Sequence, residues 1–135
     1  MPDHFFVYGT LIPQFAPEHL REVLAGFQYV GEGSLPGTLY DIGNYPGAVF
    51  DDSSPATVFG RVYQVACDGL LLAELDRYEG YDQLSPEAGE YIRQRRNVEL
   101  DNGTVVQCWV YDYNWSTAGF PTIASGRWDG DKAQL

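Results

Sequence analysis

The stretch YIRQRRNVELDNGTVVQCWVYDY, residues 91–113, holds two runs of β-branched and aromatic residues separated by Asn102-Gly103. An Asn-Gly dipeptide between two such runs is a strong short-range signal of a β-hairpin. The pattern predicts one strand over Tyr91–Leu100 and a second over Thr104–Tyr113. We therefore expect an antiparallel sheet, around which the other segments are interpreted.

The same stretch predicts a register. If the dipeptide forms a two-residue turn, Arg96 lies opposite Trp109 and Arg93 lies opposite Asp112. Cross-strand pairing then accounts for most of the basic cluster that Arg93 and Arg96 form with Arg95. We interpret this cluster as part of the sheet and not as a nucleic-acid interface.

Several short apolar segments precede the hairpin. The segment 27–42 carries Gly31, Gly33 and Gly37, which is typical of strands bent by bulges or corners. Bent strands favour a small barrel over a flat sheet. The other predicted strands cover residues 5–8, 48–50 and 58–65. The first of these is ended by Gly9.

Two segments have the signals of short helices. Pro17 suits the first turn of a helix over 18–24. Asp68 is a good N-cap for a helix over 69–78, and Gly80 is a good stop. The predicted fold class is therefore α+β: a small mixed, mostly antiparallel β-barrel with two or so short helices.

The length of 135 residues suits a single domain over 1–135. Regular structure is expected to fade after residue 113, so that residues 114–135 form an irregular C-terminal tail. Ile123 and Trp128 are the side chains expected to pack this tail back on the barrel.

Charge and cysteine content limit the possible partners. The formal net charge is −11, from 19 acidic and 8 basic residues, and this charge repels phosphate backbones and anionic lipids. We expect neither nucleic-acid nor membrane partners. Cys67 and Cys108 lack metal-site spacing and are interpreted as reduced, half-buried thiols, with a disulfide left open. The opening Met-Pro-Asp-His has no secretory pattern, so a cytoplasmic location is expected.

Glu79 is the first candidate for chemistry. Leu72, Leu75 and Glu79 are spaced i, i+3, i+7, which places the carboxylate on the apolar face of the predicted helix. It also lies in the last turn, where the helix dipole disfavours a negative charge. Both effects predict a raised pKa, suited to general acid and base work. The alternative is a carboxylate at a frayed helix end, turned to water.

The second candidate is Tyr8-Gly9-Thr10-Leu11. A glycine after a buried strand allows a sharp turn that brings consecutive N–H groups together, which suits a carboxylate or a developing oxyanion. The alternative is an ordinary turn. No metal site is predicted, and Asp76 is a poor dyad partner because it lies about 60° round the helix from Glu79.

Six short motifs occur in one order along nearly the whole chain. The N-terminal YGTL followed some seventy residues later by LDxxEG is specific in combination. Together the motifs resemble the γ-glutamylcyclotransferase-like family. They are Val7–Leu11, Tyr45–Ala48, Gly60–Tyr63, Leu75–Tyr81, Tyr91–Arg93 and Ser125–Trp128.

The resemblance implies a barrel in which a single catalytic glutamate, Glu79, faces a substrate-binding loop formed by Tyr8, Gly9, Thr10 and Leu11. It implies a γ-glutamyl amide as substrate, 5-oxoproline and a free amine or amino acid as products, and no metal or organic cofactor. Tyr91, Tyr113 and Arg93 are further candidates for the cavity wall. Their alternative role is packing or cross-strand pairing, which we favour for Arg93 because Asp112 offers a partner.

Two other functions are left open by the residues. The first is a non-catalytic module that binds a carboxylate metabolite on the same fold. The second is an acidic interaction protein, which predicts an exposed apolar patch and no pocket. The leaving group and the oligomeric state are not predicted.

Overall fold

The computed structural model describes residues 3–9, 26–43, 45–65, 73, 75–77, 79–81, 84–85 and 88–128. The predicted helix over 18–24, the loop residues Thr10 and Leu11, and Cys67 lie outside these ranges. The described strands are β1 (Asp3–Val7), β2 (Gln28–Asp41), β3 (Pro46–Phe50), β4 (Thr57–Val65), β5 (Tyr91–Leu100) and β6 (Val105–Tyr113).

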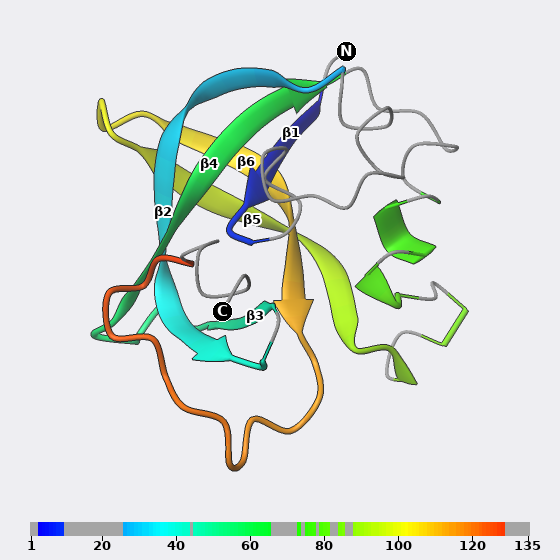
Figure 1. Ribbon diagram of the computed structural model, residues 1–135. Helices are drawn as coiled ribbons and strands as arrows, with labels where there is room; N and C mark the ends of the chain where they lie inside the picture. Colours follow the sequence, from blue (N-terminus) through cyan, green and yellow to red (C-terminus); the bar gives the residue numbers. More distant parts are fainter. Residues whose placement is uncertain are drawn as a thin grey trace.

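Five of these strands close into a barrel. They follow the order β2, β4, β1, β6, β5, and β5 pairs back to β2 through Gly33↔Leu100 and Ser34↔Glu99. Only the contact of β1 with β6 is parallel, so the sheet is mixed and mostly antiparallel, as predicted. Strand β3 pairs with the C-terminal part of β2, at the lower end of the barrel in Figure 1.

The bends expected in the glycine-rich segment are present in β2. Its pairing with β4 shifts between Tyr29 and Gly31, where a β-bulge lies. A bulge bends the strand that carries it, so one long strand serves both the barrel and the pair with β3. Figure 1 shows this strand curving along the barrel.

The β5–β6 hairpin forms, but the predicted register is wrong by one residue. Arg95 pairs with Trp109 and Arg93 pairs with Tyr111. The loop has three residues because Leu100 N–H donates to Thr104 O at 2.8 Å and Gly103 N–H donates to Leu100 O at 2.8 Å. Gly103 has a φ of +87°, the left-handed conformation that ends such a three-residue loop.

The shift of one residue changes which side chains share a face. Arg93 lies on the face of Tyr111 and not on that of Asp112, because each step of one residue reverses the face of a strand. The predicted pairs Arg96–Trp109 and Arg93–Asp112 are therefore corrected.

The barrel is packed on both of its faces. Every strand contributes to the interior cluster, in which Phe6, Val62 and Val110 are almost fully buried. A second cluster lies on the outer face of β1, β4, β5 and β6, and Leu75 of the helical segment packs into it. The helical segment thus covers this outer face, where alternate residues of β1 such as Phe5 meet it.

The interior also holds one of the cysteines. Cys108 is a free thiol with no exposed surface, so it is more deeply buried than predicted. Burial raises its pKa to about 12.

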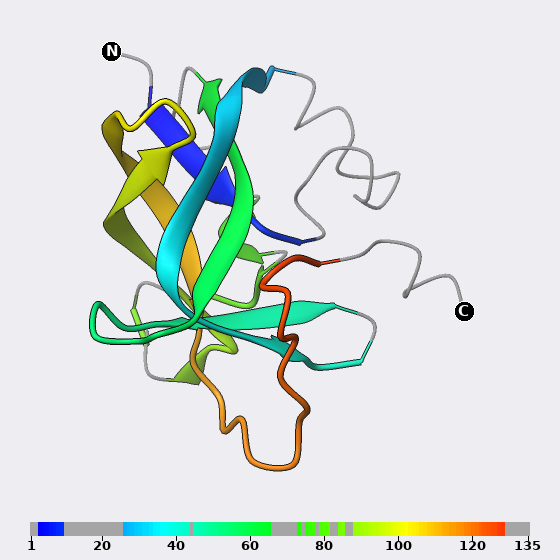
Figure 2. The ribbon, with the colours of Figure 1, turned by 90° about the vertical axis from the view of Figure 1, so that its left-hand side faces the viewer.

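The segment after β6 returns to the barrel. Ile123 N–H donates to Leu39 O at 2.7 Å, and Phe59 N–H donates to Gly126 O at 2.8 Å. Trp128 is buried, and Figure 2 shows the orange-to-red segment looping away and coming back. A membrane would need a longer and more apolar helix than any that the described residues form.

Candidate functional site

A pocket opens where the end of β1 meets the helical segment and the hairpin. It contains about 310 Å³ of space free of protein atoms, part of it at the open mouth. The residues that line it are Phe6, Val7, Tyr8, Gly9, Pro46, Glu79, Tyr91 and Tyr111.

Four predicted site residues meet in this pocket, although they come from three separate parts of the chain. Tyr8 and Gly9 follow β1, Glu79 ends the helical segment, and Tyr91 begins β5. Tyr113 is not among the lining residues. Its ring packs edge-on against the ring of Tyr91, with centroids 5.3 Å apart, so it supports the wall from behind.

The position of Glu79 follows from the way its helix ends. Residues 73, 75–77 and 79 are helical, and Gly80 follows with a φ of +71°. Tyr81 N–H donates to Asp76 O at 2.9 Å, and Gly80 N–H donates to Arg77 O at 3.3 Å. These two bonds form a Schellman motif, which makes Glu79 the last residue of the helix.

The Glu79 carboxylate lies half-buried in the pocket wall and is not turned freely to water. Loss of water contact is the main reason that its pKa rises to about 8, and the charges of Glu90 and Asp76 add to the effect. No hydrogen bond joins it to another described residue. The carboxyl group is therefore poised to exchange a proton near neutral pH.

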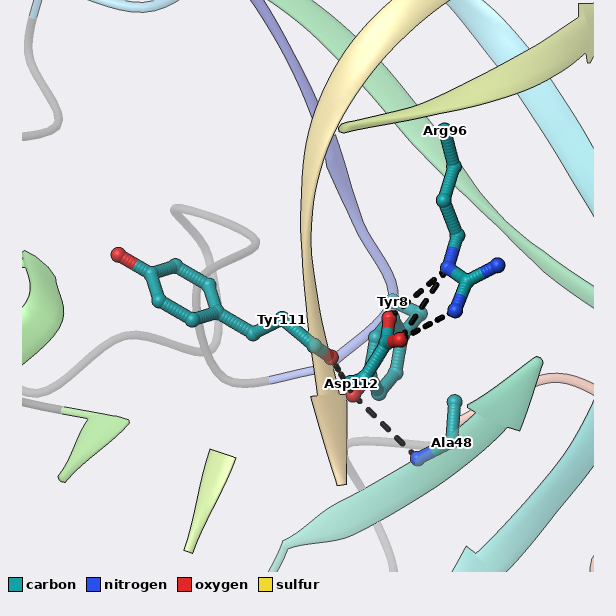
Figure 3. Close-up of polar contacts among 5 residues, drawn as sticks. All are labelled: Tyr8, Ala48, Arg96, Tyr111 and Asp112. Atoms are coloured by element: carbon teal, nitrogen blue, oxygen red, sulfur yellow. Dashed lines mark hydrogen bonds and ion pairs between the residues drawn. The ribbon is translucent and has the colours of Figure 1, made fainter. Parts of the chain in front are cut away.

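Tyr8 is anchored inside the barrel. Its hydroxyl donates to Tyr111 O at 2.5 Å and accepts the N–H of Ala48 at 3.3 Å (Figure 3). Burial raises its pKa well above the usual value, so it remains a neutral phenol. These contacts fix the residue that precedes Gly9 and leave its hydroxyl committed to the backbone.

Asp76 lies behind the pocket and has two partners that sequence reasoning missed. Arg93 Nε contacts Asp76 Oδ1 at 2.8 Å and Nη2 contacts Oδ2 at 3.3 Å. The Tyr111 hydroxyl donates to Asp76 Oδ1 at 2.7 Å. The guanidinium also stacks on the Trp109 ring, 4.4 Å from its centroid.

Asp112, the predicted partner of Arg93, binds Arg96 instead. Asp112 accepts two bonds from Arg96 Nε, at 3.1 and 3.2 Å, and a further bond from Nη2 (Figure 3). Burial raises the pKa of Asp112, and the Arg96 charge opposes that rise.

Tyr91, which lines the pocket, and its neighbour Tyr45 each make a hydrogen bond between separate segments of the chain. The Tyr91 hydroxyl donates to Pro46 O at 2.6 Å, which joins the start of β5 to the start of β3. The Tyr45 hydroxyl donates to Glu90 Oε2. No group of three or more His, Cys, Asp or Glu side chains in the described part of the chain is arranged to hold a metal ion.

Comparison with known proteins gives consistent matches along the chain. The sequence profile of the family described as Gamma-glutamyl cyclotransferase, AIG2-like, matches residues 5–130. The gamma-glutamylcyclotransferase family protein YtfP of Escherichia coli K12 is 36% identical over 129 residues, which cover 94% of this chain and 97% of YtfP.

Solved structures share the fold. An AIG2-like protein from Mus musculus matches with a TM-score of 0.70 and 26% identity, covering 95% of this chain and 88% of its own. YkqA from Bacillus subtilis matches with a TM-score of 0.67 and 29% identity over 95% of this chain. The chain spans only 40% of the YkqA chain. The matched range and the identity to YtfP establish that the chain belongs to the gamma-glutamyl cyclotransferase, AIG2-like family.

Proposed function

We propose that this protein is a γ-glutamyl cyclotransferase, which converts a γ-glutamyl amide into 5-oxoproline and a free amine or amino acid. One observation carries the proposal: a half-buried carboxylate, Glu79, shares a pocket with Tyr8 and Gly9, the residues that follow β1. Family membership supports the reaction class, and the assignment of roles to these residues is our own.

Ring closure is intramolecular. The α-amine of the substrate attacks its own γ-carbonyl, so the enzyme has to hold a folded conformer and manage protons. Glu79 takes a proton from the α-ammonium, the new C–N bond forms, and the bond to the leaving nitrogen breaks. The ammonium starts with three protons and the lactam keeps one. The other two depart on the leaving amine, so no net proton is consumed.

The turn after β1 supplies the electrostatic part of the mechanism. In this proposal the N–H groups of Gly9, Thr10 and Leu11 bind the α-carboxylate of the substrate or the tetrahedral oxyanion. Removal of one such donor typically costs about 3 kcal/mol of transition-state stabilisation. The anchored ring of Tyr8 keeps the first part of this turn in place.

The proposed substrate is a free small molecule, and the proposed site of action is the cytoplasm. The net charge of −11 disfavours substrates carried on nucleic acid or on anionic membranes. The mechanism proposed for these residues uses side chains and backbone groups of this chain alone.

The test is incubation with a panel of γ-glutamyl amino acids and γ-glutamylamines, with 5-oxoproline measured by mass spectrometry. We expect product from at least one class, and a loss of several orders of magnitude in Glu79→Gln, which keeps the shape of the side chain. Glu99→Gln changes an exposed carboxylate on β5 and is the matched control. Absence of 5-oxoproline with every substrate would favour the non-catalytic binding module.

A further inference from the structure

The Glu79 carboxylate makes no hydrogen bond to another described residue, so its position depends on the residues that hold its helix in place. One such residue is Asp76, which lies three residues earlier on the same helix. Its backbone carbonyl accepts the Tyr81 N–H that closes the helix, and its side chain binds Arg93 and Tyr111. One residue thus connects the end of the helix with the β5–β6 hairpin.

Asp76 is joined to β5 by a buried ion pair with Arg93. The side chains of Arg93 and Asp76 are only 6% and 9% exposed, and their contact is bidentate. The Arg93 guanidinium lies over the rings of Tyr81 and Trp109, at 5.7 and 4.4 Å from their centroids. A charge pair with two directional bonds and packed faces allows little movement of the helix relative to the strand.

The connection to β6 reaches the other side of the pocket. The Tyr111 hydroxyl donates to Asp76, while the Tyr111 carbonyl accepts the hydroxyl of Tyr8. Tyr111 also lines the pocket between these two contacts. A continuous chain of hydrogen bonds therefore runs from the residue before Gly9, through Tyr111 and Asp76, to Arg93.

We infer that Arg93, Asp76 and Tyr111 form a positioning unit that holds the Glu79 carboxylate at a fixed place opposite the backbone of Tyr8 and Gly9. The inference rests on the proposed function for its catalytic consequence. Arg93 and Asp76 act through the helix end, and neither lines the pocket.

The pKa of Glu79 is a second quantity that tests the inference, because it depends on the surroundings of the carboxylate. Carboxyl and phenol groups from its own helix and from neighbouring segments lie within electrostatic reach of Glu79: Asp76, Glu90, Tyr8, Tyr45, Tyr91 and Tyr111. Because burial is the main cause of its raised pKa, a looser helix end that admits water lowers that pKa.

The same hairpin provides a matched control. Arg96 and Asp112 form a second multidentate pair between β5 and β6, and the Arg96 guanidinium lies 5.3 Å from the centroid of the Phe50 ring. This pair does not contact the helical segment in the described structure. Arg93→Lys and Arg96→Lys each keep the charge and remove the planar fork.

The kinetic experiment compares these two variants. In Arg93→Lys we expect kcat to fall about 10- to 100-fold with KM within about 2-fold, because misplacement of the base affects the chemical step. In Arg96→Lys we expect an unchanged kcat despite a similar loss of thermal stability. Equal effects of the two variants on kcat, or an unchanged kcat in Arg93→Lys, would overturn the inference.

A measurement without turnover separates this inference from the proposed function. Glu79 is titrated by NMR through its side-chain carboxyl carbon in the wild-type protein and in both variants. We expect its pKa to fall from about 8 toward the usual carboxyl range in Arg93→Lys and to stay unchanged in Arg96→Lys. A titration of Glu79 that is the same in all three proteins contradicts the positioning role, whether or not 5-oxoproline is formed.

Discussion

In the proposed reaction, Glu79 is the residue of this chain whose ionisation should govern the rate. Its pKa is raised to about 8, so the carboxylate form is lost as pH falls through that value. If Glu79 accepts the substrate proton, kcat/KM rises with pH and levels off above about 8. A pH–rate profile of the wild-type enzyme measures this. If kcat/KM instead levels off above pH 4 to 5, the group that controls the rate is not a Glu79 carboxyl with a raised pKa.

The same group should make stability depend on pH. The pKa of Glu79 is higher in the folded protein, at about 8, than its unfolded value of 4.5. Protonation of Glu79 therefore stabilises the fold fully below pH 4.5, and this stabilisation is lost as pH rises through about 8. Glu79→Gln should therefore raise the free energy of unfolding at pH 9 by about 1–2 kcal/mol and change it little near pH 4.5. Urea denaturation at the two values tests this, and an equal effect at both would contradict it.

Single residues differ in how far the sequence could identify them. The pocket position and raised pKa of Glu79 could be predicted because Glu79 conflicts with two local preferences, apolar spacing and the helix dipole, and such conflicts can be read from neighbouring residues. Arg93 and Asp76 could not be paired in this way. Their contact depends on which face of β5 meets the helix, and a register error of one residue reverses that face.

Among the structural elements, the helix that carries Glu79 depends on its final glycine. Gly80 has a φ of +71°, so Gly80→Ala should cost about 1–2 kcal/mol of stability and, by shifting the helix end, reduce kcat. Gly103→Ala is the control, because Gly103 has a φ of +87° in a hairpin loop. Urea denaturation should show similar losses, with kcat reduced only in Gly80→Ala. Equal kcat values would separate the helix end from catalysis.

The hairpin shows why elements are easier to predict than their pairing. Alternating apolar residues and Asn-Gly were sufficient to place β5 and β6. The dipeptide alone does not decide between two and three loop residues, since both use a glycine with positive φ. No non-glycine residue in the described chain has a positive φ, so Asn102 does not adopt the conformation that a two-residue type I′ turn requires.

For the molecule as a whole, the dominant long-range term is its net charge. With a formal charge of −11, the folded chain repels itself, and added salt screens that repulsion. The midpoint of thermal unfolding should rise by a few degrees between 10 and 200 mM NaCl, as measured by circular dichroism. A midpoint that falls with salt would mean that specific ion pairs such as Arg93–Asp76 outweigh the overall repulsion.

The barrel as a class was predictable from the residues, while the meeting of Glu79 with Tyr8 and Gly9 in one pocket was expected only from the family resemblance. Glycine-interrupted strands such as β2 indicate bending, which leads to closure. The pocket requires β1 to lie beside β6 in parallel, so that Gly9 comes close to the helix that follows β4. Strands β1 and β6 are about one hundred residues apart in the sequence, so no local sequence pattern indicates that they lie side by side.

The seam between β2 and β5 has a further consequence. Two residue pairs close the barrel there, whereas nine pairs join β5 to β6. When the barrel opens locally, the backbone amide protons at the contact between β2 and β5 should be the first to exchange with solvent. The pocket residues Tyr8 and Glu79 lie at the end of β1 and on the helical segment, away from that contact, so its opening would leave them together.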